Sequence, residues 1–549
     1  MNVKPADRKP SFFDLIYLYG PPGSGKSSVG KVLAENLAVP FVDLDQRIED
    51  QAGMSIPEIF DKQGEPGFRQ LEKKVLQEVS KMDWGVIALG GGALLDSDCR
   101  TLVETAGPIF CLSASEQALL ERLGSTSIER PLLIESGGKT QKYARLVDLL
   151  AKRSQHYASF TNRIETEGKS PEQIAWELQI RRGAFHVRGM ITQSSASNKD
   201  AGGSARPFPL GYDVRIASAL DGMGEALRRR GLSGPIALVT DQNVAEFYLA
   251  RAVKSLQEVG YSTRSIIIPP GESSKIMSTV SYLWQEFLEA GLERKSTVVA
   301  LGGGVVGDLS GFAAATYMRG VPWVNVPTSL LAIADASLGG KTGADLPEGK
   351  NLVGAFHAPE MVLTDSSTLK TLPQAELCSG IAEVIKAGII GDPDLFRSCA
   401  SGWPAIEADW DEIIPRAMAV KIRVIEADPY EGGQRAALNY GHTIGHAVEK
   451  TSNYQLRHGE AVAIGMVAEA RLAEQVGLAQ DGLADEIKNA CELLGLPVEI
   501  PENLSRSSIL EAMQVDKKRS DARVRFALPR KIGEVLTGIE VSDIEAILQ

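Results

Sequence analysis

Several features that would mark a secreted or membrane protein are scarce or absent in this chain of 549 residues. Only five cysteines occur, and none forms a CxxC pair: Cys99, Cys111, Cys378, Cys399 and Cys491. This sparse, odd-numbered set excludes a disulfide framework and is typical of thiols in a reducing compartment. No uncharged apolar run approaches the roughly 20 residues of a membrane-spanning helix. The N-terminal apolar stretch contains Asp14 and leads into a glycine-rich motif, which indicates a first strand and not a secretion signal. We therefore expect a cytoplasmic protein.

Positive charge is also in deficit. The chain has 58 Lys and Arg against 70 Asp and Glu, a net charge of -12. This balance argues against a nucleic-acid or membrane partner, although anionic small molecules can still bind at local basic sites. With 44% hydrophobic and 23% charged residues, the composition is that of a globular protein. The length exceeds what one hydrophobic core supports, so we expect two to four domains.

The pattern along the chain indicates α/β domains separated by a linker. Residues 192–209 (TQSSASNKDAGGSARPFP) are rich in Ser, Ala and Gly and have no hydrophobic periodicity. On both sides, short apolar runs such as FDLIYLYG and STVVALGGG alternate with amphipathic stretches, which predicts parallel sheets covered on both faces. From about residue 376 the pattern becomes helical. We predict an N-terminal domain in 1–183, a flexible linker in 184–209, an α/β lobe in 210–375 and a mostly helical lobe in 376–549.

The first domain contains a phosphate-binding motif. Residues 20–27, GPPGSGKS, fit G-x-x-x-x-G-K-[ST] between the apolar run LIYLYG and an amphipathic stretch. In such a loop the backbone N–H groups surround phosphate oxygens, the lysine reaches the β- and γ-phosphates and the hydroxyl binds Mg²⁺. The predicted ATP-binding residues are Gly23, Ser24, Gly25, Lys26, Ser27 and Ser28.

Acidic and basic side chains after this motif indicate where a phosphate acceptor binds. Asp43 and Asp45 end the predicted strand FVDLD, and because strand side chains alternate we expect both carboxylates on one face. One would hold the metal and the other would meet the acceptor hydroxyl. A triple glycine at 90–92 follows another strand. Arginines are the expected clamps for a carboxylate or phosphate, and the candidates are Arg69, Arg130 and Arg153. The alternative for Arg69 is a structural ion pair with Glu65 or Glu72.

Taken in order, these motifs resemble shikimate kinase from about residue 12 to 180. The resemblance implies that ATP and Mg²⁺ are used, that Ser27 and Asp43 support Mg²⁺, and that Asp45 binds the shikimate hydroxyls and acts as base. It implies these further contacts: Arg69 and Arg153 to the carboxylate, Gly91 and Gly92 behind the ring, and Arg130 on a lid over ATP formed by residues 124–139. The nearest alternative is a sugar-acid kinase such as gluconate kinase.

The second half contains a glycine-rich turn typical of dinucleotide binding. Residues 302–308, GGGVVGD, match G-x-G-x-x-G between a predicted strand and a predicted helix. Unlike the usual fingerprint, no acid ends a strand about 20 residues later. The candidate ribose contacts instead lie upstream, at Asp241, Glu272 and Lys275. This departure argues against an ordinary Rossmann dehydrogenase.

Histidine is rare, with six residues in the chain, yet three of them fall within 17 positions. His442 and His446 are four residues apart and share a helix face, and His458 opens the next predicted helix. This grouping suits a divalent metal such as Zn²⁺, completed by a carboxylate. We expect that carboxylate to be Glu383, which is three residues before Lys386 on a largely apolar helix. A structural Glu–Lys pair is the alternative.

The second half resembles 3-dehydroquinate synthase over about residues 210–540. The motifs GGGVVGDLSGFAAATYMRG, DASLGGKTG, GKNLVGAFHAP, SGIAEVIK, LNYGHTIGHAVE and RHGEAVAIGM occur in the family's order. The resemblance implies that Glu383, His442 and His458 bind Zn²⁺ or Co²⁺, and that His446 contacts the substrate. The other implied substrate contacts are Arg319, Asp335, Lys341, Asn351, Lys386, Lys421, Arg435, Asn439 and Lys518, the last chosen over Lys517. The implied NAD contacts are Gly302, Gly303, Gly304, Asp308, Thr328, Ser329 and Lys350, beside Asp241, Glu272 and Lys275.

The resemblance also implies a reaction for each half. The kinase would phosphorylate shikimate. In the second half, 3-deoxy-arabino-heptulosonate 7-phosphate would be oxidised by NAD⁺ with the metal polarising the carbinol oxygen, lose phosphate, be reduced again and close to 3-dehydroquinate. The alternatives here are another sugar-phosphate cyclase or an NAD- and metal-dependent polyol dehydrogenase, and for either half a degenerate binding module. The two reactions are non-consecutive steps of aromatic-precursor synthesis. The family also makes a homodimer through the second half an expectation.

Overall fold

The computed structural model describes residues 15–124, 139–190, 192–193, 211–431, 433–515 and 524–541. The chain divides into two compact units, Met1–Phe185 and His186–Gln549. Within the described ranges, no helix is both long enough and apolar enough to cross a membrane.

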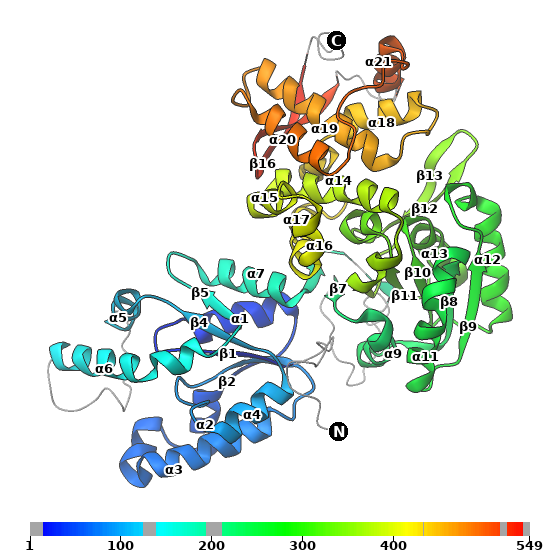
Figure 1. Cartoon of the computed structure of the whole chain (residues 1–549). Coiled ribbons are helices and arrows are strands. Elements are labelled where there is room, and N and C mark those ends of the chain that lie inside the picture. Colours follow the sequence, from blue (N-terminus) through cyan, green and yellow to red (C-terminus); the bar gives the residue numbers. More distant parts are fainter. Residues whose placement is uncertain are drawn as a thin grey trace. The chain divides into compact units, whose positions relative to one another are not determined.

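The first unit is a five-stranded parallel sheet covered by helices on both faces (Figure 1). The strand order is β2-β3-β1-β4-β5. The strands are β1 (Leu15–Tyr19), β2 (Phe41–Asp43), β3 (Gly85–Ala88), β4 (Ile109–Ser113) and β5 (Arg163–Glu165). The helices are α1 (Lys26–Leu37), α2 (Leu44–Ala52), α3 (Ile56–Val79), α4 (Ser97–Ala106), α5 (Glu116–Gly124), α6 (Lys139–Ala158) and α7 (Pro171–Arg182).

The alternation of side chains along β1 explains the two covered faces. Leu15, Tyr17 and Tyr19 belong to the core cluster that includes side chains of α2, α3 and α4. Ile16 and Leu18 belong to the opposite cluster, with side chains of α1 and α7. All five are buried, as expected for a central strand of a parallel sheet.

The second unit begins with a seven-stranded sheet in the order β6-β7-β14-β11-β10-β8-β9. Every strand pair from β7 to β9 in this order is parallel. The strands are β6 (Ala184–Arg188), β7 (Gly211–Ile216), β8 (Ser233–Asp241), β9 (Thr263–Ile268), β10 (Ser296–Gly302), β11 (Trp323–Pro327) and β14 (Met361–Thr364). The accompanying elements are helices α9 (Ala219–Arg230), α11 (Ala250–Glu258), α12 (Met277–Glu289) and α13 (Gly304–Thr316), and the antiparallel hairpin of β12 (Lys341–Leu346) and β13 (Gly349–Phe356).

A mostly helical lobe completes the second unit (Figure 1). Its helices are α14 (Gln374–Gly391), α15 (Pro393–Cys399), α16 (Trp403–Ala408), α17 (Trp410–Ala427), α18 (His442–Thr451), α19 (His458–Gln475), α20 (Leu483–Leu493) and α21 (Arg506–Val515). A hairpin of β15 (Arg525–Lys531) and β16 (Glu534–Glu540) follows, and Phe526 and Leu528 pack with α18 and α19. The predicted sequence of α/β domain, α/β lobe and helical lobe is confirmed.

The predicted start of the linker at residue 184 is wrong. Residues 184–188 form β6, an edge strand of the seven-stranded sheet. Val187 is fully buried, and His186 Nδ1 lies 2.9 Å from Oδ1 of Asp213 in β7. The apolar alternation of AFHVR is therefore used in a sheet, and α7 is joined to β6 by Gly183 alone. Residues 194–209 of the predicted linker lie outside the described residues.

The expectation for Asp45 is also corrected. β2 ends at Asp43, whose side chain accepts a hydrogen bond from the Asp45 N–H at 3.1 Å and caps α2. Asp45 therefore lies in the first turn of a helix, and the two acids do not alternate along one strand. A capping carboxylate stabilises the helix start, which ends the strand early.

Candidate functional sites

The phosphate loop lies between β1 and α1. A Cβ at Gly20 would lie 2.3 Å from the Leu112 carbonyl oxygen, and Gly25, the N-cap of α1, has a φ of 90°, so both positions require glycine. Lys26 Nζ donates to the carbonyl oxygens of Gly20 and Pro21, each at 2.9 Å. The lysine ammonium is thus held across its own loop, where a nucleotide phosphate would bind. Of the other predicted ATP contacts, Gly23 lies in the loop, Ser24 is buried and Ser28 is exposed on α1.

The predicted Mg²⁺ pair is close together. Ser27 Oγ donates to Asp43 Oδ2 at 2.5 Å, although Asp43 is 16 residues away. The parallel neighbours β1 and β3 and the pairing of β2 with β3 bring the carboxyl end of β2 to the loop after β1. A hydroxyl and a carboxylate at the start of a phosphate-binding helix are suitable Mg²⁺ ligands.

The predicted acceptor residues converge on the glycine turn after β3. A Cβ at Gly92 would lie 2.9 Å from Arg69 Nη2 and 3.2 Å from Arg153 Nη1. A Cβ at Gly90 would lie 3.0 Å from Asp45 Oδ1. Any side chain at Gly92 would therefore occupy the space between the two guanidinium groups, which is where an acceptor carboxylate would bind.

Two further residues complete this turn: Tyr157, which we did not predict, and Glu72, which we named only as an alternative partner of Arg69. Glu72 is buried and binds Arg69 Nη1 at 2.6 Å, and Tyr157 Oη donates to the Gly91 carbonyl oxygen at 2.7 Å. Arg69 also pairs with Glu65 at 3.2 Å, so the ion pairs considered as its alternative role do form. Glu72 follows Arg69 by one helical turn, a spacing at which side chains on a helix meet. Arg130 and residues 125–138 of the predicted lid lie outside the described residues.

The glycine-rich turn of the second unit joins β10 to α13. Gly303 caps the helix, and a Cβ there would lie 3.4 Å from Ser329 Oγ. The Thr328 N–H donates to the Gly302 carbonyl at 3.0 Å. Asp241 ends β8, which is the neighbour of β10 in the sheet. It can therefore take the place of the acid that usually ends a strand after the glycine-rich turn. The arrangement leaves backbone N–H groups at a helix start near a strand-end carboxylate, as a dinucleotide requires.

A second group near this turn centres on Lys275. Its Nζ lies 2.6 Å from Asp308 Oδ2 and donates to Asn351 Oδ1 at 2.5 Å. Burial lowers the pKa of Lys275, but the charge of Asp308 outweighs this and raises it. A predicted NAD contact from α13 thus meets a predicted substrate contact from β13. Glu272 is exposed, in the 3-10 helix Glu272–Ser274 that precedes this lysine.

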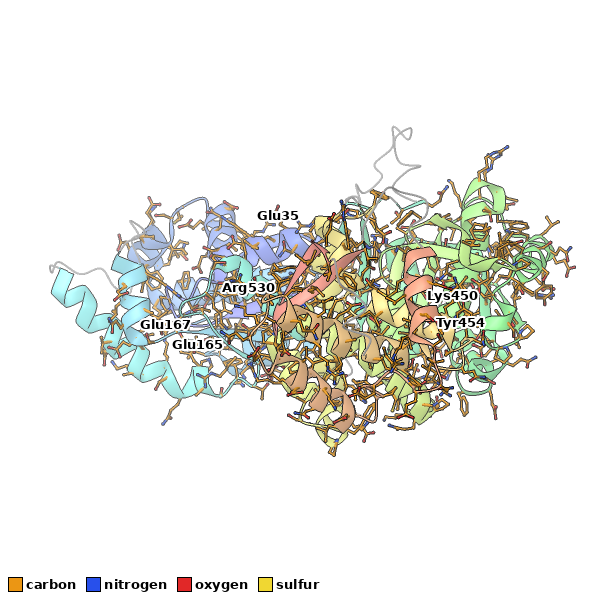
Figure 2. All side chains as sticks on the ribbon, turned by 90° about the horizontal axis from the view of Figure 1, so that it is seen from above. Glu35, Glu165, Glu167, Lys450, Tyr454 and Arg530 are labelled. Carbon is orange, nitrogen blue, oxygen red and sulfur yellow. The ribbon has the colours of Figure 1, made fainter. Side chains whose placement is uncertain are left out.

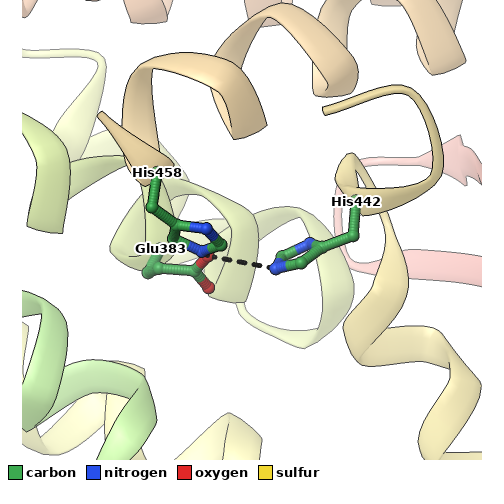
Figure 3. A group of neighbouring side chains, drawn as sticks. All are labelled: Glu383, His442 and His458. Carbon is green, nitrogen blue, oxygen red and sulfur yellow. Dashed lines mark hydrogen bonds and ion pairs between the residues drawn. The ribbon is translucent and has the colours of Figure 1, made fainter. Parts of the chain in front are cut away.

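The predicted metal ligands come from three helices and meet at one point (Figure 3). Glu383 lies within α14, whereas His442 and His458 are the first residues of α18 and α19. Glu383 Oε1 lies 3.5 Å from His442 Nε2 and 3.3 Å from His458 Nε2, and one ligand atom from each residue falls within 4.8 Å of the others. Two imidazoles and a carboxylate at this spacing fit a Zn²⁺-type ion with a position left open.

The remaining polar atoms of the two histidines are also occupied. His442 Nδ1 lies 3.1 Å from the Tyr440 carbonyl oxygen, and His458 Nδ1 lies 3.5 Å from Glu449 Oε2. Both rings therefore direct Nε2 toward Glu383. Burial, together with the charge of Lys386, lowers the pKa of His442 to about 3, so that ring is neutral. Burial also acts to lower the pKa of His458, but hydrogen bonding to Glu383 and Glu449 raises it to about 9.

Buried cations surround the metal ligands. Lys386 contacts Glu383 Oε2, and Lys421 Nζ donates to Asp335 Oδ1 at 2.6 Å. Burial opposes ionisation of Glu383, but the charge of Lys386 and hydrogen bonding to His458 hold its pKa well below its usual range. The Glu–Lys alternative is thus part of the same arrangement, because Glu383 contacts both the lysine and the histidines.

The other predicted substrate contacts differ in exposure: Arg435 is buried, whereas Lys341 is exposed. Lys341 and Arg435 both approach Glu431, and Arg435 Nη1 donates to the Pro429 carbonyl at 3.0 Å. His446 and Asn439 are exposed, and the His446 ring centroid is 4.9 Å from that of His442. Within the described ranges no hydrogen bond or ion pair connects Arg319 to these groups; it is exposed at the end of the 3-10 helix Tyr317–Arg319. Lys517 and Lys518 lie outside the described residues.

Comparison with known proteins supports both resemblances. Residues 22–181 match the family model of shikimate kinase, and residues 265–379 and 380–519 match the N-terminal and C-terminal models of 3-dehydroquinate synthase. The 3-dehydroquinate synthase of Nostoc sp. (strain PCC 7120 / SAG 25.82 / UTEX 2576) is 45% identical over 348 residues, which are 62% of this chain and 96% of that protein. The chain belongs to the 3-dehydroquinate synthase family. The synthase of Synechococcus sp. (strain ATCC 27144 / PCC 6301 / SAUG 1402/1) is likewise 45% identical, over 59% of this chain and 91% of that protein.

Solved structures of related cyclases share the fold of the second unit. A 2-deoxy-scyllo-inosose synthase complexed with carbaglucose-6-phosphate, NAD⁺ and Co²⁺ has a TM-score of 0.56 and 25% identity, covering 61% of this chain and 95% of that one. A 2-epi-5-epi-valiolone synthase from Streptomyces hygroscopicus subsp. jinggangensis 5008, with NAD⁺ and Zn²⁺ bound, has a TM-score of 0.56 and 27% identity, covering 63% and 97%. The chain is therefore a fusion of an N-terminal shikimate kinase domain and a C-terminal 3-dehydroquinate synthase domain.

Proposed function

We propose that the second unit converts 3-deoxy-arabino-heptulosonate 7-phosphate to 3-dehydroquinate with release of phosphate. The observation that carries the proposal is the meeting of Glu383, His442 and His458 from three helices, beside the buried Lys386. When bound, NAD⁺ would accept and return a hydride, and the divalent metal would polarise the reacting carbinol oxygen. The solved cyclases with NAD⁺ and Zn²⁺ or Co²⁺ support this cofactor set.

The protein's own residues would bind and orient the substrate. Lys341 and Arg435 both approach the carboxylate of Glu431, so they are suited to bind a phosphate or carboxylate of the substrate. Lys421 is held by Asp335 near the metal ligands and would bind a ring oxygen. His446, exposed beside His442, would contact the substrate from the helix that carries the metal ligand.

We propose that the first unit transfers the γ-phosphate of ATP to shikimate. Lys26 would leave the carbonyl oxygens of its loop for the nucleotide phosphates, and the pair Ser27–Asp43 would bind Mg²⁺. Asp45 would accept the proton of the reacting hydroxyl, and Arg69 and Arg153 would bind the carboxylate on either side of Gly92.

Phosphate release tests the synthase proposal. The full chain with NAD⁺ and Zn²⁺ is expected to release phosphate from the heptulosonate phosphate, and His458→Ala is expected to release none. The same variant should phosphorylate shikimate as fast as the parent, because its substitution lies in the other unit. A parent that binds metal and NAD⁺ but releases no phosphate would favour another cyclase or a polyol dehydrogenase.

We also propose a cytoplasmic location and a homodimer through the synthase unit. All five cysteines are free thiols, which fits a reducing compartment. The dimer rests on the family resemblance alone, and a sedimentation mass of one chain at micromolar concentration would contradict it.

A further inference from the structure

Glu449 lies on the far side of the His458 ring from the other metal ligands. His458 presents Nε2 to Glu383 Oε1 at 3.3 Å and Nδ1 to Glu449 Oε2 at 3.5 Å. The two ring nitrogens point in different directions. An ion bound at Nε2 would therefore lie on the side of Glu383 and not on the side of Glu449. Glu449 also lies seven residues after His442 on α18, on the same helix face.

Glu449 is itself held from the nucleotide-binding lobe. Its side chain is buried, and its Oε1 accepts a hydrogen bond from Lys350 Nζ at 3.0 Å. Lys350 belongs to β13, and its Nζ also lies 4.2 Å from the centroid of the Tyr454 ring, which follows α18. One hairpin lysine thus reaches across to the helix that carries His442.

We propose that Glu449 is a positioning residue for the metal ligand His458, and that Lys350 holds Glu449 in place. A metal-binding imidazole must keep its lone pair on Nε2, and a carboxylate that accepts Nδ1–H selects that tautomer, orients the ring and raises its basicity. Lys350 holds Oε1 of the buried Glu449 carboxylate, which leaves Oε2 directed at the ring. The hairpin of the nucleotide-binding lobe would thereby complete the metal site of the helical lobe. The inference rests on the proposed metal site.

Metal affinity of the full-length protein tests the proposal without relying on turnover. The metal would be removed with a chelator, and Zn²⁺ or Co²⁺ would be titrated back without NAD⁺ or substrate. Glu449→Gln keeps the shape of the side chain but weakens the Nδ1 contact, and should bind metal about 10- to 100-fold more weakly. Lys350→Met should weaken binding less, and should have little further effect in the double variant, because it acts through Glu449.

Matched controls separate positioning from charge and folding. Glu474→Gln removes one negative charge, as Glu449→Gln does, but from a carboxylate of α19 that accepts a hydrogen bond from the Ala484 N–H. Lys450→Met removes the exposed lysine labelled in Figure 2, which follows Glu449 in the sequence. Both should bind metal as the parent does. Because Lys350 is exposed on a hairpin, Lys350→Met remains informative if Glu449→Gln does not fold.

Each outcome decides the question. Metal binding by Glu449→Gln and Lys350→Met as tight as that of the parent would overturn the inference. Glu449→Gln could instead lose metal binding completely, and the Co²⁺ spectrum of the parent could indicate one protein ligand more than Glu383, His442 and His458. Together these two results would identify Glu449 as a ligand and would also overturn the inference. Failure of the parent itself to bind metal, or unchanged binding by His458→Ala, would instead contradict the proposed metal site.

Discussion

At the scale of single residues, the space above Gly92 shows how two distant arginines form one anion site. Arg69 comes from α3 and Arg153 from α6, yet both guanidinium groups lie within 3.2 Å of a Cβ built on Gly92. They serve different partners: Arg69 binds Glu72 at 2.6 Å, whereas Arg153 Nη1 donates to the Gly91 carbonyl oxygen at 3.2 Å. Arg153 is therefore more readily redirected to a ligand.

We expect Arg153→Ala to weaken binding of the acceptor and not of ATP. Loss of a charge-assisted hydrogen bond costs about 1.5–3 kcal/mol, or roughly 10- to 100-fold in KM for shikimate. Initial rates with each substrate varied in turn would measure both KM values. Arg163→Ala, which removes an exposed arginine of β5, is the control. An equal rise in KM for ATP would place Arg153 at the nucleotide instead.

At the scale of elements, glycines allow the metal-bearing helices to approach closely. A Cβ at Gly465 of α19 would lie 1.9 Å from the Gly441 carbonyl oxygen, immediately before His442. A Cβ at Gly459 would lie 1.9 Å from the Ser379 carbonyl oxygen of α14. Both clashes are with backbone, which cannot move aside as a side chain does. The positions of the ligands thus depend on helix spacing as well as on the ligands themselves.

Gly465→Ala should therefore separate α18 from α19. We expect a loss of about 1–3 kcal/mol in the free energy of unfolding from overpacking, and weaker metal binding because His442 shifts. Urea denaturation and Co²⁺ titration would measure the two effects. In Gly307→Ala the nearest atom would be the Asn325 side-chain amide at 3.3 Å, so this helical glycine should tolerate the methyl group. Equal stability of the two variants would contradict the expected clash.

The pairing of the edge strand β6 leads to a second prediction at the scale of elements. Because β6 precedes residues 194–209 but pairs in the sheet of the second unit, a cut in that segment should not release the kinase. A protease site inserted after residue 198 should yield two fragments that co-elute in gel filtration. Val187→Asp, which places a charge at a fully buried position of β6, should let the cut fragments separate. Separation without this substitution would show that β6 does not hold the fragments together.

At the scale of the whole molecule, the two candidate sites share no residue and lie in different units. The kinase set falls within residues 23–153 and the synthase set within residues 241–518. The two reactions are non-consecutive, so neither site needs the product of the other. We therefore expect the activities to be separable by substitution and by metal.

Lys26→Met should lower the kinase turnover by about 100-fold or more while phosphate release stays unchanged, because only the first unit loses its cation at the nucleotide phosphates. Chelation followed by Mg²⁺ should restore kinase activity alone, and Zn²⁺ or Co²⁺ should then restore phosphate release. Both assays on one preparation would check this. A synthase rate that falls with Lys26→Met would indicate communication between the units.

The sequence alone determined the features whose cause is local. The phosphate loop, the spacing of His442 and His446 and the alternation of strands and helices depend on neighbours a few residues apart, so they can be recognised without the fold. Glu383 was selected because a charge on a largely apolar helix needs a partner, and the family resemblance implied the same ligand. It lies 59 positions before His442, so no local spacing connects the two residues. By the same local reasoning, FVDLD was expected to be a strand throughout. The strand instead ends at Asp43, whose side chain caps the helix that begins at Leu44.

Only the tertiary structure decided which distant groups meet. The order of β8 and β10 in the sheet places Asp241 beside the glycine turn, and the packing of α14, α18 and α19 brings Glu383 to the histidines. Lys350 meets Glu449 although 99 positions separate them. Residues 184–188, which we predicted to be part of the linker, pair in a sheet as β6. These contacts arise because burying apolar faces fixes how strands and helices pack, and polar side chains are then carried to partners that no local pattern specifies.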